Sequence, residues 1–586
     1  MLVWSLAALP LAVTLHVAEA YPTPDSLQYS SLGKHGGIAT EVAECSEIGV
    51  ELLTQGGSAV DAIIAGSLCV GVIAAYHSGI GGGGFGFSPT SLTSTSVRSV
   101  GDGKVSYDMV DFRETAPGAS NLWMYVNSTD PTASTIGGLA VGVPGELRGW
   151  ELLHQKYGRL PWPKLFEGAI KLARCGFTVN QDLAAELNND TYPFLTTDPL
   201  WAEVYAPNGI LLQQGDTAYR KRYANTLEII TQQGADAFYT GSIAENIVST
   251  ATSNGGIITL DDLKNYSALT RTPVNITYRG NRIFSTVAPS SGAVVLSALK
   301  VFEAWPATAK VDDPAYDIVA HRLIEATRFG YGQRTWYGDP AYTANVSSLE
   351  REFLEEPEVE KVRALINDST TYPAPYYNPS NYIVLDDHGT SHLAAADQWG
   401  TVVSLTKTIN LYWGSNLMTP DGIILNDEMD DFSSPGLTNA FGFAPSPANF
   451  IYPGKRPQSS IASSIAEDLE TGEFKIATGA AGGSRIITAT LQNLHYTLDQ
   501  GLTPNASVHT SRWHDQLTNV TYFELPAPAD GLPGFDNGTV SFLASLNYNV
   551  TYEGITGSTS HIVGKINGTF HAFSDPRKPA GRGYAY

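Results

Sequence analysis

The chain has 586 residues, of which 43% are hydrophobic and 16% are charged, a composition typical of a folded globular protein. At this length more than one packed layer or domain is expected. Its 35 lysines and arginines stand against 58 acidic residues, and the resulting formal net charge of −23 disfavours nucleic acid and anionic membrane surfaces as partners.

The first twenty residues have the pattern of a secretion signal. An apolar run over residues 2–18 leads into Ala18-Glu19-Ala20, a small-x-small cleavage site, so we predict a signal peptide over residues 1–20. An uncleaved membrane anchor is the alternative, but the run is short, Pro10 interrupts it and no Lys or Arg precedes it. We expect no other membrane span. The expected location is the medium or the cell wall, with the vacuole as an alternative.

Asn-x-Ser/Thr sequons are frequent, as expected of a secreted glycoprotein from a eukaryote. They lie at Asn127, Asn189, Asn265, Asn275, Asn345, Asn367, Asn505, Asn519, Asn537, Asn549 and Asn567.

The chain has only 3 cysteines, too few to build the fold from disulfides. Cys45 and Cys69 lie on two helix-like runs, residues 40–53 and 58–72, and could face each other in a helical hairpin and form one disulfide. Cys175 is then expected to be free and buried. No Cys/His spacing suggests zinc, and we expect neither a metal nor a cofactor.

A glycine-rich segment and an arginine motif follow. His77-Ser-Gly-Ile-Gly-Gly-Gly-Gly-Phe85 could cradle phosphate, but a helix-like run precedes it and no Lys-Ser/Thr follows. In Val110-Asp-Phe-Arg-Glu-Thr-Ala-Pro117, Arg113 could bind the α-carboxylate of an amino acid through two parallel hydrogen bonds. The alternative for Arg113 is a structural ion pair with Glu114 or Asp111.

Residues 388–410 read as a β-hairpin. Residues 391–396 and 401–408 are the two strands, and Asp397-Gln-Trp-Gly400 has turn composition. If Ala396 pairs with Thr401, Thr390 falls opposite Lys407 and within one residue of Thr408. Two threonine hydroxyls at the open end of a hairpin suit a nucleophile with a neighbour that orients it. The alternative is an ordinary surface threonine.

Three motifs lie beyond the hairpin. Leu425-Asn-Asp-Glu-Met-Asp-Asp-Phe-Ser433 concentrates carboxylates; a solvated acidic turn is one alternative, and a calcium loop lacks the required spacing. Gly454-Lys-Arg-Pro-Gln-Ser-Ser460 ends in two hydroxyls that can donate to a carboxylate or a carbonyl. Thr478-Gly-Ala-Ala-Gly-Gly-Ser-Arg-Ile-Ile-Thr488 is a glycine loop opening a helix, where adjacent N–H groups form an anion site. Phosphate is the alternative anion, although no P-loop lysine accompanies the loop.

These motifs, taken together and in this order from about Gly37 to Arg577, resemble the gamma-glutamyltranspeptidases, which are N-terminal-nucleophile hydrolases. The resemblance is carried by G-T-S-H before a strand ending in T-I-N, and by D-F-R-E-T-A-P, N-D-E-M-D-D-F-S and G-G-S-R-I-I-T. It implies an α+β fold, a four-layer αββα sandwich with helices outside two stacked sheets. We expect a secreted fungal member of the family.

The resemblance also implies self-cleavage between Gly389 and Thr390. The products would be a large subunit, residues 21–389, and a small catalytic subunit, residues 390–586, which together form one compact unit. Residues 346–380, rich in acid, Pro and Tyr, resemble a flexible stretch at the end of the large subunit. Residues 434–453 resemble the lid over the substrate pocket, with Phe441 as its gate.

The family's site residues carry over to matching positions of this chain. Thr390 would be the nucleophile, and Gly482 and Gly483 the oxyanion hole. Substrate contacts would come from Arg113 to the glutamyl carboxylate, from Asn410, Glu428 and Asp431 to the α-amino group, and from the serine pair Ser459 and Ser460.

The implied substrates are glutathione and related gamma-glutamyl amides, with water, amino acids or dipeptides as acceptors. Two alternatives remain open. One is a related amide acylase of the β-lactam side-chain type, and the other is an unprocessed, non-catalytic secreted glycoprotein.

Overall fold

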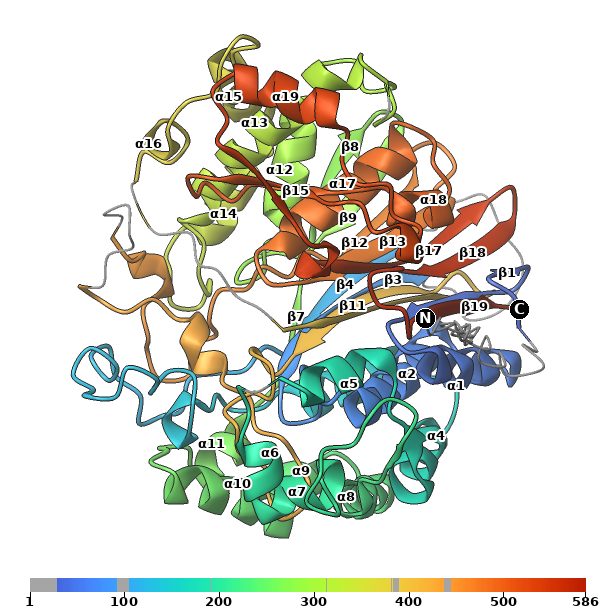
Figure 1. Ribbon diagram of the computed structural model, residues 1–586, viewed down its shortest axis with the longest axis vertical. Coiled ribbons are helices and arrows are strands. Elements are labelled where there is room, and N and C mark those ends of the chain that lie inside the picture. Colours follow the sequence, from blue (N-terminus) through green and yellow to red (C-terminus); the bar gives the residue numbers. More distant parts are fainter. Residues whose placement is uncertain are drawn as a thin grey trace, which may run out of the picture.

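The computed structural model describes residues 29–91, 105–189, 191–311, 313–380, 382, 389–436 and 444–586. The predicted signal peptide and the predicted lid residue Phe441 lie outside this part of the chain. Two stacked β-sheets form the centre of the molecule, and helices cover their outer faces (Figure 1). Within the described residues no helix is both long and apolar enough to cross a membrane.

Each main sheet has seven strands, and neighbouring strands run antiparallel. The first sheet has the order β19 (Arg582–Ala585), β2 (Gly37–Thr40), β10 (Ser391–Ala396), β11 (Val402–Thr408), β3 (Gly83–Ser91), β4 (Val105–Asp111), β7 (Leu269–Arg271). The second has the order β1 (Leu32–Gly33), β18 (Thr569–Ser574), β17 (Thr559–Ile566), β13 (Phe474–Ala481), β12 (Ser464–Asp468), β9 (Asn281–Ser285), β8 (Val274–Tyr278). Two small sheets combine β14 (Trp513–His514), β15 (Thr521–Glu524) and β16 (Val550–Glu553), and β5 (Phe177–Thr178) with β6 (Thr217–Ala218).

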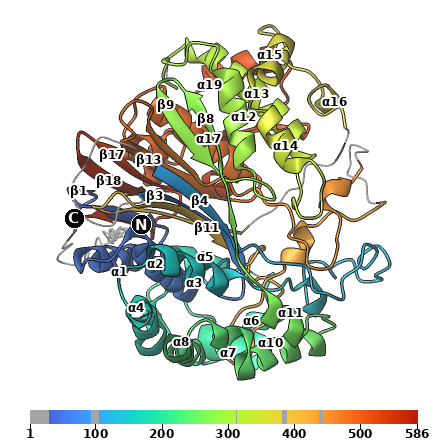
Figure 2. The ribbon, with the colours of Figure 1, turned by 180° about the vertical axis from the view of Figure 1, so that it is seen from behind.

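The helices divide between the two sides of the sandwich, as Figures 1 and 2 show. On the side of the first sheet lie α1 (Ala43–Thr54), α2 (Ala59–Ile73), α3 (Glu146–Tyr157), α4 (Trp162–Cys175), α5 (Gln181–Leu187), α6 (Phe194–Thr197), α7 (Pro199–Tyr205), α8 (Lys221–Gln233), α9 (Asp236–Tyr239), α10 (Gly241–Ser253) and α11 (Leu260–Asn265). On the side of the second lie α12 (Gly292–Phe302), α13 (Tyr316–Arg334), α14 (Val346–Glu352), α15 (Glu356–Leu365), α16 (Ala374–Tyr377), α17 (Arg485–Leu498), α18 (Pro504–His509) and α19 (Asn537–Ser545).

Strand β10 shows why the sandwich has four layers. Its successive side chains point to opposite faces of the first sheet. Leu393 and Ala395 belong to the apolar core shared with α1 and α2, whereas Ala394 and Ala396 belong to the core shared with the second sheet. Both faces of β10 are therefore buried, and the predicted αββα arrangement is confirmed.

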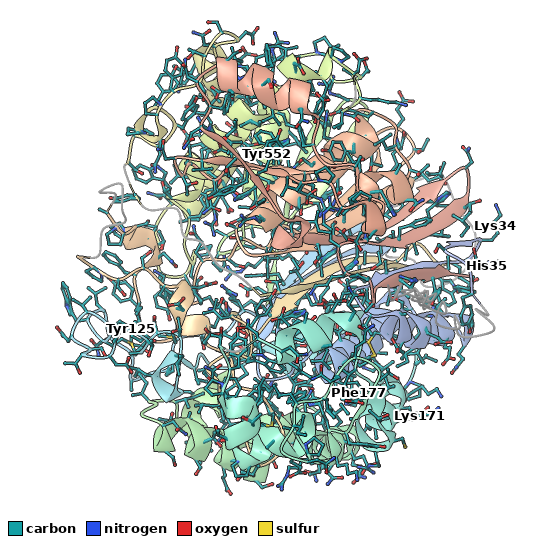
Figure 3. All side chains as sticks on the ribbon, viewed as in Figure 1. Lys34, His35, Tyr125, Lys171, Phe177 and Tyr552 are labelled. Atoms are coloured by element: carbon teal, nitrogen blue, oxygen red, sulfur yellow. A yellow bond between two sulfur atoms is a disulfide. The ribbon has the colours of Figure 1, made fainter. Side chains whose placement is uncertain are left out.

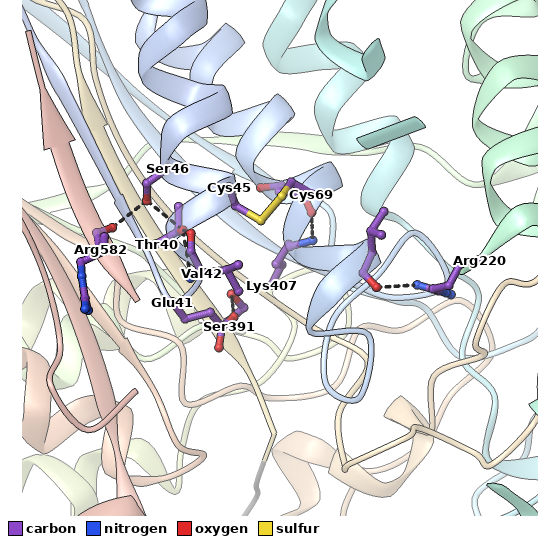
Figure 4. Close-up of a disulfide and its surroundings, with 12 residues drawn as sticks. Thr40, Glu41, Val42, Cys45, Ser46, Cys69, Arg220, Ser391, Lys407 and Arg582 are labelled. Atoms are coloured by element: carbon purple, nitrogen blue, oxygen red, sulfur yellow. Dashed lines mark hydrogen bonds between the residues drawn. A yellow bond between two sulfur atoms is a disulfide. The ribbon is translucent and has the colours of Figure 1, made fainter. Parts of the chain in front are cut away.

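The hairpin of α1 and α2 is held by a disulfide and a helix cap. Cys45 and Cys69 form the predicted bond (Figure 4). At the start of α2 the Ser58 hydroxyl accepts from the Asp61 N–H at 3.2 Å, and the Asp61 carboxylate accepts from the Ser58 N–H at 2.8 Å. This reciprocal cap satisfies two N–H groups that have no partner inside the helix.

Two sequence predictions about the helical parts of the chain are wrong. Cys175 is free but exposed rather than buried, because it ends α4 two residues beyond Ala173 and falls off the face that Leu165, Phe166 and Ala169 bury. Residues 346–380 are not a flexible stretch, since they form α14, α15 and α16. Apolar side chains such as Val359 and Tyr377 pack into the core from this segment and fix it.

Candidate active site

The open end of the β10–β11 hairpin brings two threonines together. Ser391 pairs with Lys407 and Ala396 with Val402, so the same register places Thr390 opposite Thr408. The predicted pairing of Ala396 with Thr401 is wrong by one residue. Asp397 pairs with Thr401 instead, and its carboxylate accepts from the Thr401 N–H at 2.9 Å, which closes the turn one residue later.

Both threonine hydroxyls meet the carbonyl group of Gly389. Thr390 Oγ1 donates to this oxygen at 2.6 Å and Thr408 Oγ1 at 2.5 Å. The Asn410 N–H donates to Thr408 Oγ1 at 2.7 Å, which leaves the Thr408 proton directed at Gly389. Thr390 is half-buried and is not an ordinary surface residue.

Gly389 is suited to this place because its φ is +87° and a Cβ there would stand 2.2 Å from the Asn410 carbonyl oxygen. The first glycine-rich segment also serves close packing. A Cβ on Gly82 would stand 1.9 Å from the Thr408 carbonyl oxygen. The backbone at position 82 can therefore lie this close to the end of β11 only because Gly82 has no side chain.

Arg113 lies just after β4, and its guanidinium forms ion pairs with Glu428 and Asp431 on the 3₁₀ turn Glu428–Asp431. The guanidinium also donates to the Gln458 carbonyl oxygen at 2.9 Å. Asp111 does not pair with this side chain, because Arg271 binds it at 2.7 Å. The side chains of Arg113 and Glu428 are both 1% exposed, which excludes a solvated acidic turn.

Several carboxyl groups crowd this one cation. Burial raises the pKa of the Asp431 carboxyl, against the pull of Arg113, and it raises the pKa of Glu428 in the same way. Burial likewise raises the pKa of Glu114 to about 8. This buried cluster thus has an excess of acidic groups around a single guanidinium. Within the described residues no group of three His, Cys, Asp or Glu side chains could hold a metal ion.

Asn410 connects this acidic cluster to the threonine pair. Its amide Nδ2 donates to the Asp427 carbonyl oxygen at 3.1 Å, next to Glu428. Asn426, which the sequence did not single out, accepts from the Glu428 N–H at 3.0 Å and donates to the Gly81 carbonyl oxygen at 2.7 Å. Its only sequence signal is its place inside the acidic motif.

A small apolar cluster supports the 3₁₀ turn from outside. Met429 and Phe432 pack with Ile451, and Tyr125 covers them from the loop at the rim, where Figure 3 labels it. The Tyr125 hydroxyl donates to the Leu139 carbonyl oxygen at 2.8 Å.

The glycine pair precedes α17, as predicted, and it directly follows β13. Gly482 has a φ of +117° and Gly483 a φ of +57°. Ser404 Oγ on β11 donates to the Thr478 carbonyl oxygen on β13 at 3.0 Å across the sandwich, and a Cβ on Gly479 would meet the ring of His392. From these contacts, β11 runs on to Thr408, which lies opposite Thr390, and β13 runs on to Ala481 in the same direction. The glycine pair that follows β13 therefore lies at the end of the sandwich that holds Thr390.

The serine pair lies at this end as well. Thr406 Oγ1 is 3.0 Å from Ser463 Oγ, and the chain runs from Ser463 back to Ser459 and Ser460 in the direction of Thr408. Arg334, which the sequence did not indicate, donates to Ser460 Oγ at 2.9 Å from α13. No local sequence pattern could reveal this contact, because the two residues are 126 positions apart.

The protein thus has a four-layer sandwich with a threonine hydroxyl at the end of a buried central strand. This arrangement places it in the class of N-terminal-nucleophile hydrolases. The fold is similar to that of a cephalosporin acylase from Bacillus halodurans, with a TM-score of 0.80 and 22% identity over 97% of this chain and 98% of that one. At that identity the likeness is one of fold.

Sequence comparison is more specific. The model of the Gamma-glutamyltranspeptidase family matches residues 45–585. A glutathione hydrolase proenzyme of Arthroderma benhamiae is 42% identical over 93% of this chain and 92% of its own length. A glutathione hydrolase of Aspergillus flavus is 39% identical over 96% of this chain and 92% of its own. The chain belongs to the gamma-glutamyltranspeptidase family and is an enzyme of that family.

Proposed function

We propose that this enzyme cleaves the gamma-glutamyl amide bond of glutathione and related compounds through a gamma-glutamyl ester on Thr390. The observation that carries the proposal is the meeting of the Thr390 and Thr408 hydroxyls at the Gly389 carbonyl group. It combines a nucleophile, its orienting partner and the bond that must be cut to free the nucleophile's amino group.

The first reaction would be self-cleavage. Thr390 Oγ attacks the Gly389 carbonyl carbon, and the peptide C–N bond breaks as the C–O bond of an ester forms. The Thr390 nitrogen takes up the hydroxyl proton and becomes a free amine. Water then hydrolyses the ester, leaving a carboxylate on Gly389 and restoring the Thr390 hydroxyl. Thr408 would assist by donating to the developing oxyanion.

Each turnover would use the same hydroxyl again. The free α-amino group has an ordinary pKa near ~8, so part of it is neutral and can accept the Thr390 proton, directly or through Thr408. The oxygen attacks the gamma-carbonyl carbon, and the Gly482 and Gly483 N–H groups stabilise the oxyanion. One such donor typically contributes roughly 3–4 kcal/mol. The amide C–N bond then breaks, and the leaving amine takes the proton.

The glutamyl ester would be resolved by water, which yields glutamate, or by the amine of an amino acid or dipeptide, which yields a new gamma-glutamyl amide. Recognition of the glutamyl head group is supported by the opposite charges of its pocket. Arg113 would bind the α-carboxylate with the serine pair, while Glu428 and Asp431 would exchange part of their contact with Arg113 for the α-ammonium group. Asn410 would assist them.

These charges favour a glutamyl substrate over the amide acylase alternative, because a zwitterionic head group meets both signs in the pocket. A direct test incubates the purified protein with glutathione, with and without glycylglycine. Glutamate and cysteinylglycine are expected without the acceptor, and gamma-glutamyl-glycylglycine with it. An enzyme that releases neither product, yet removes an acyl side chain from a cephalosporin, would contradict the proposal.

We also propose that the protein is secreted and glycosylated. Support comes from the composition of residues 1–20 and from the sequon asparagines, all of which are exposed except the half-buried Asn367. Mass spectrometry of protein from the culture medium would test both points, by the first residue of the mature chain and by its glycan sites.

A further inference from the structure

Behind the reacting hydroxyl, the residue after the nucleophile is fixed by a buried acid. The Ser391 hydroxyl donates to Glu41 Oε1, and Figure 4 shows the two side chains meeting between the first sheet and α1. Ser391 is 0% and Glu41 2% exposed. Glu41 follows β2, the strand that pairs with β10 on its other side, and it lies in the part of the chain assigned to the predicted large subunit.

Ser391 and Thr390 point to opposite faces of the sheet. Ser391 lies opposite Lys407, whose ammonium group donates to the Ser67 carbonyl oxygen of α2 at 2.8 Å on the helix side. Thr390 precedes it by one residue and therefore faces the second sheet and the glycine pair. The Ser391 hydroxyl cannot touch a substrate bound on that other face.

His77 completes the arrangement. Its Nε2 lies 3.0 Å from Glu41 Oε2, and its carbonyl oxygen accepts from the Ile409 N–H at 3.2 Å. The Glu41 side chain thus holds β10 one residue after Thr390, and the main chain of His77 holds Ile409, the residue that follows β11. Both strands of the hairpin are fixed from behind at the level of the reacting groups.

Glu41 is itself held rigidly. The hydroxyl of Thr40 donates to the Val42 carbonyl oxygen at 2.7 Å, and the Ala43 N–H donates to the Ala580 carbonyl oxygen at 2.8 Å. The acid therefore has little freedom to follow Ser391. Any movement of the start of β10 would break the contact.

We propose that Glu41, supported by His77, is a positioning residue that pins Ser391 and thereby fixes the Thr390 hydroxyl for attack. The inference rests on the proposed function in one respect: Thr390 is the nucleophile. Once the chain is cut before it, Thr390 is tethered only through Ser391. A first residue on a single tether would otherwise rotate away from its reactive geometry, and a displacement of about 1 Å can cost roughly 100-fold in rate.

The test is Ser391→Ala, which removes one oxygen and leaves Thr390 intact. Ser67→Ala is the matched control, because Ser67 is also a buried serine on the helix side of the first sheet, and its hydroxyl makes no hydrogen bond to the residues that the structure describes. Its contact with Lys407 uses the main-chain oxygen, which alanine keeps. The readouts are the rate of self-cleavage on denaturing gels, kcat and KM for a chromogenic gamma-glutamyl anilide on processed protein, and Tm.

Ser391→Ala is expected to lower kcat about tenfold and to slow self-cleavage, with KM and Tm close to the wild type. Ser67→Ala should leave kcat unchanged. A Ser391→Ala protein that matures and turns over at the wild-type rate overturns the proposal, and so does a loss confined to KM. A folded Ser391→Ala precursor that does not cut itself supports the same role at the earlier step.

Glu41 gives the second measurement if Ser391→Ala does not fold. Glu41→Gln keeps an oxygen that accepts from Ser391 and should retain most of kcat, whereas Glu41→Leu should lose about as much as Ser391→Ala. Equal losses in both Glu41 variants would overturn the pinning role. Self-cleavage needs no substrate, so its rate tests Ser391 even if the wild type proves inactive on glutathione.

Discussion

Thr408 Oγ1 lies 2.5 Å from the carbonyl oxygen of Gly389, a residue 19 positions away in the chain. The same hydroxyl accepts from the Asn410 N–H at 2.7 Å, so its proton is directed at the bond that we expect to be cut. The arrangement polarises that carbonyl before any substrate is present. Because each threonine makes its own contact with Gly389, the roles of Thr390 and Thr408 can be tested by separate mutations.

Thr390→Ala should give a full-length chain without gamma-glutamyl activity, because the substitution removes the nucleophile of both reactions. Thr390→Ser keeps the oxygen but loses the methyl group that restricts the rotamer, so processing and turnover should slow without vanishing. Denaturing gels and glutamate release measure the two effects. A Thr390→Ala protein that still yields two bands and a product would place the nucleophile elsewhere.

Thr408→Ala should slow both reactions by roughly 100-fold and abolish neither. Thr390 keeps its own hydroxyl and its 2.6 Å contact with Gly389, but the carbonyl loses its second donor. N-terminal sequencing of the slowly formed small band should still read Thr-Ser-His-Leu-Ala. A variant that matures as fast as the wild type would show that Thr408 has no part in the cut.

Arg113→Lys should raise KM for a gamma-glutamyl donor by roughly 10- to 100-fold while two subunits still form. A lysine keeps the charge but cannot contact Glu428, Asp431 and a substrate carboxylate with a planar fork. Arg271→Lys is a control, because Arg271 binds Asp111 rather than the acidic cluster around Arg113. An unchanged KM in Arg113→Lys would make the guanidinium purely structural.

Asn367 should be unmodified in the secreted protein, whereas exposed sequons such as Asn127 and Asn567 remain open to glycans. The Asn367 Nδ2 donates to the Tyr372 hydroxyl at 3.0 Å, and its Oδ1 accepts from Ser369 Oγ at 2.7 Å. A glycan on Nδ2 would break these contacts at a half-buried position. Enzymatic deglycosylation in heavy-oxygen water, followed by peptide mapping, would detect a modified Asn367 as labelled aspartate and so refute this expectation.

The thermal stability should be highest near pH ~5 and fall toward pH ~8. Burial raises the pKa of Glu146 and of Glu350 from 4.5 to about 7, so the folded state keeps protons that the unfolded state releases between these values. The unfolding free energy therefore decreases as pH rises through that window. At the acid end, Glu41 has a pKa of about 2 even though burial alone would raise it, because His77 lies beside it, and its contribution is lost below pH 4.5.

Glu350→Gln is the control variant for this pH dependence. Glu350 Oε1 accepts from the Ala288 N–H at 2.7 Å, and a glutamine oxygen can replace that contact without titrating. Its Tm should decline less between pH ~5 and ~8 than the Tm of the wild type. A wild-type Tm that climbs steadily over this range would contradict the expected sign.

The sequence predicted the fold class, and it brought several charged residues to one expected site. Family motifs led us to expect Arg113, Glu428 and Asp431 at one substrate site, and the structure brings their side chains into contact. The hairpin register was one residue out, because the Asp397 side chain decides how the turn closes and turn composition does not reveal that. The four layers were expected from resemblance alone.

Long-range partners were beyond the reach of local patterns. Glu41 and Ser391 are 350 positions apart, and nothing near Glu41 indicates that it meets the start of β10. The exposure of Cys175 depends on which face of α4 is covered. The folding of residues 356–377 into α15 and α16 depends on packing against α12 and α13. Such features arise from tertiary contacts that pattern and propensity do not specify.

The strand order has a consequence for the matured protein. A cut before Thr390 would leave β10 and β11 inserted between β2 and β3 of the other fragment, and β12 beside β9. The one disulfide in the described residues, Cys45–Cys69, joins two parts of the same fragment and does not span the cut. The two pieces could then separate only by dismantling both sheets, and reassembly would become a second-order reaction. Recovery of the cut enzyme after denaturation should rise with protein concentration, whereas an uncut Thr390→Ala chain should recover independently of it.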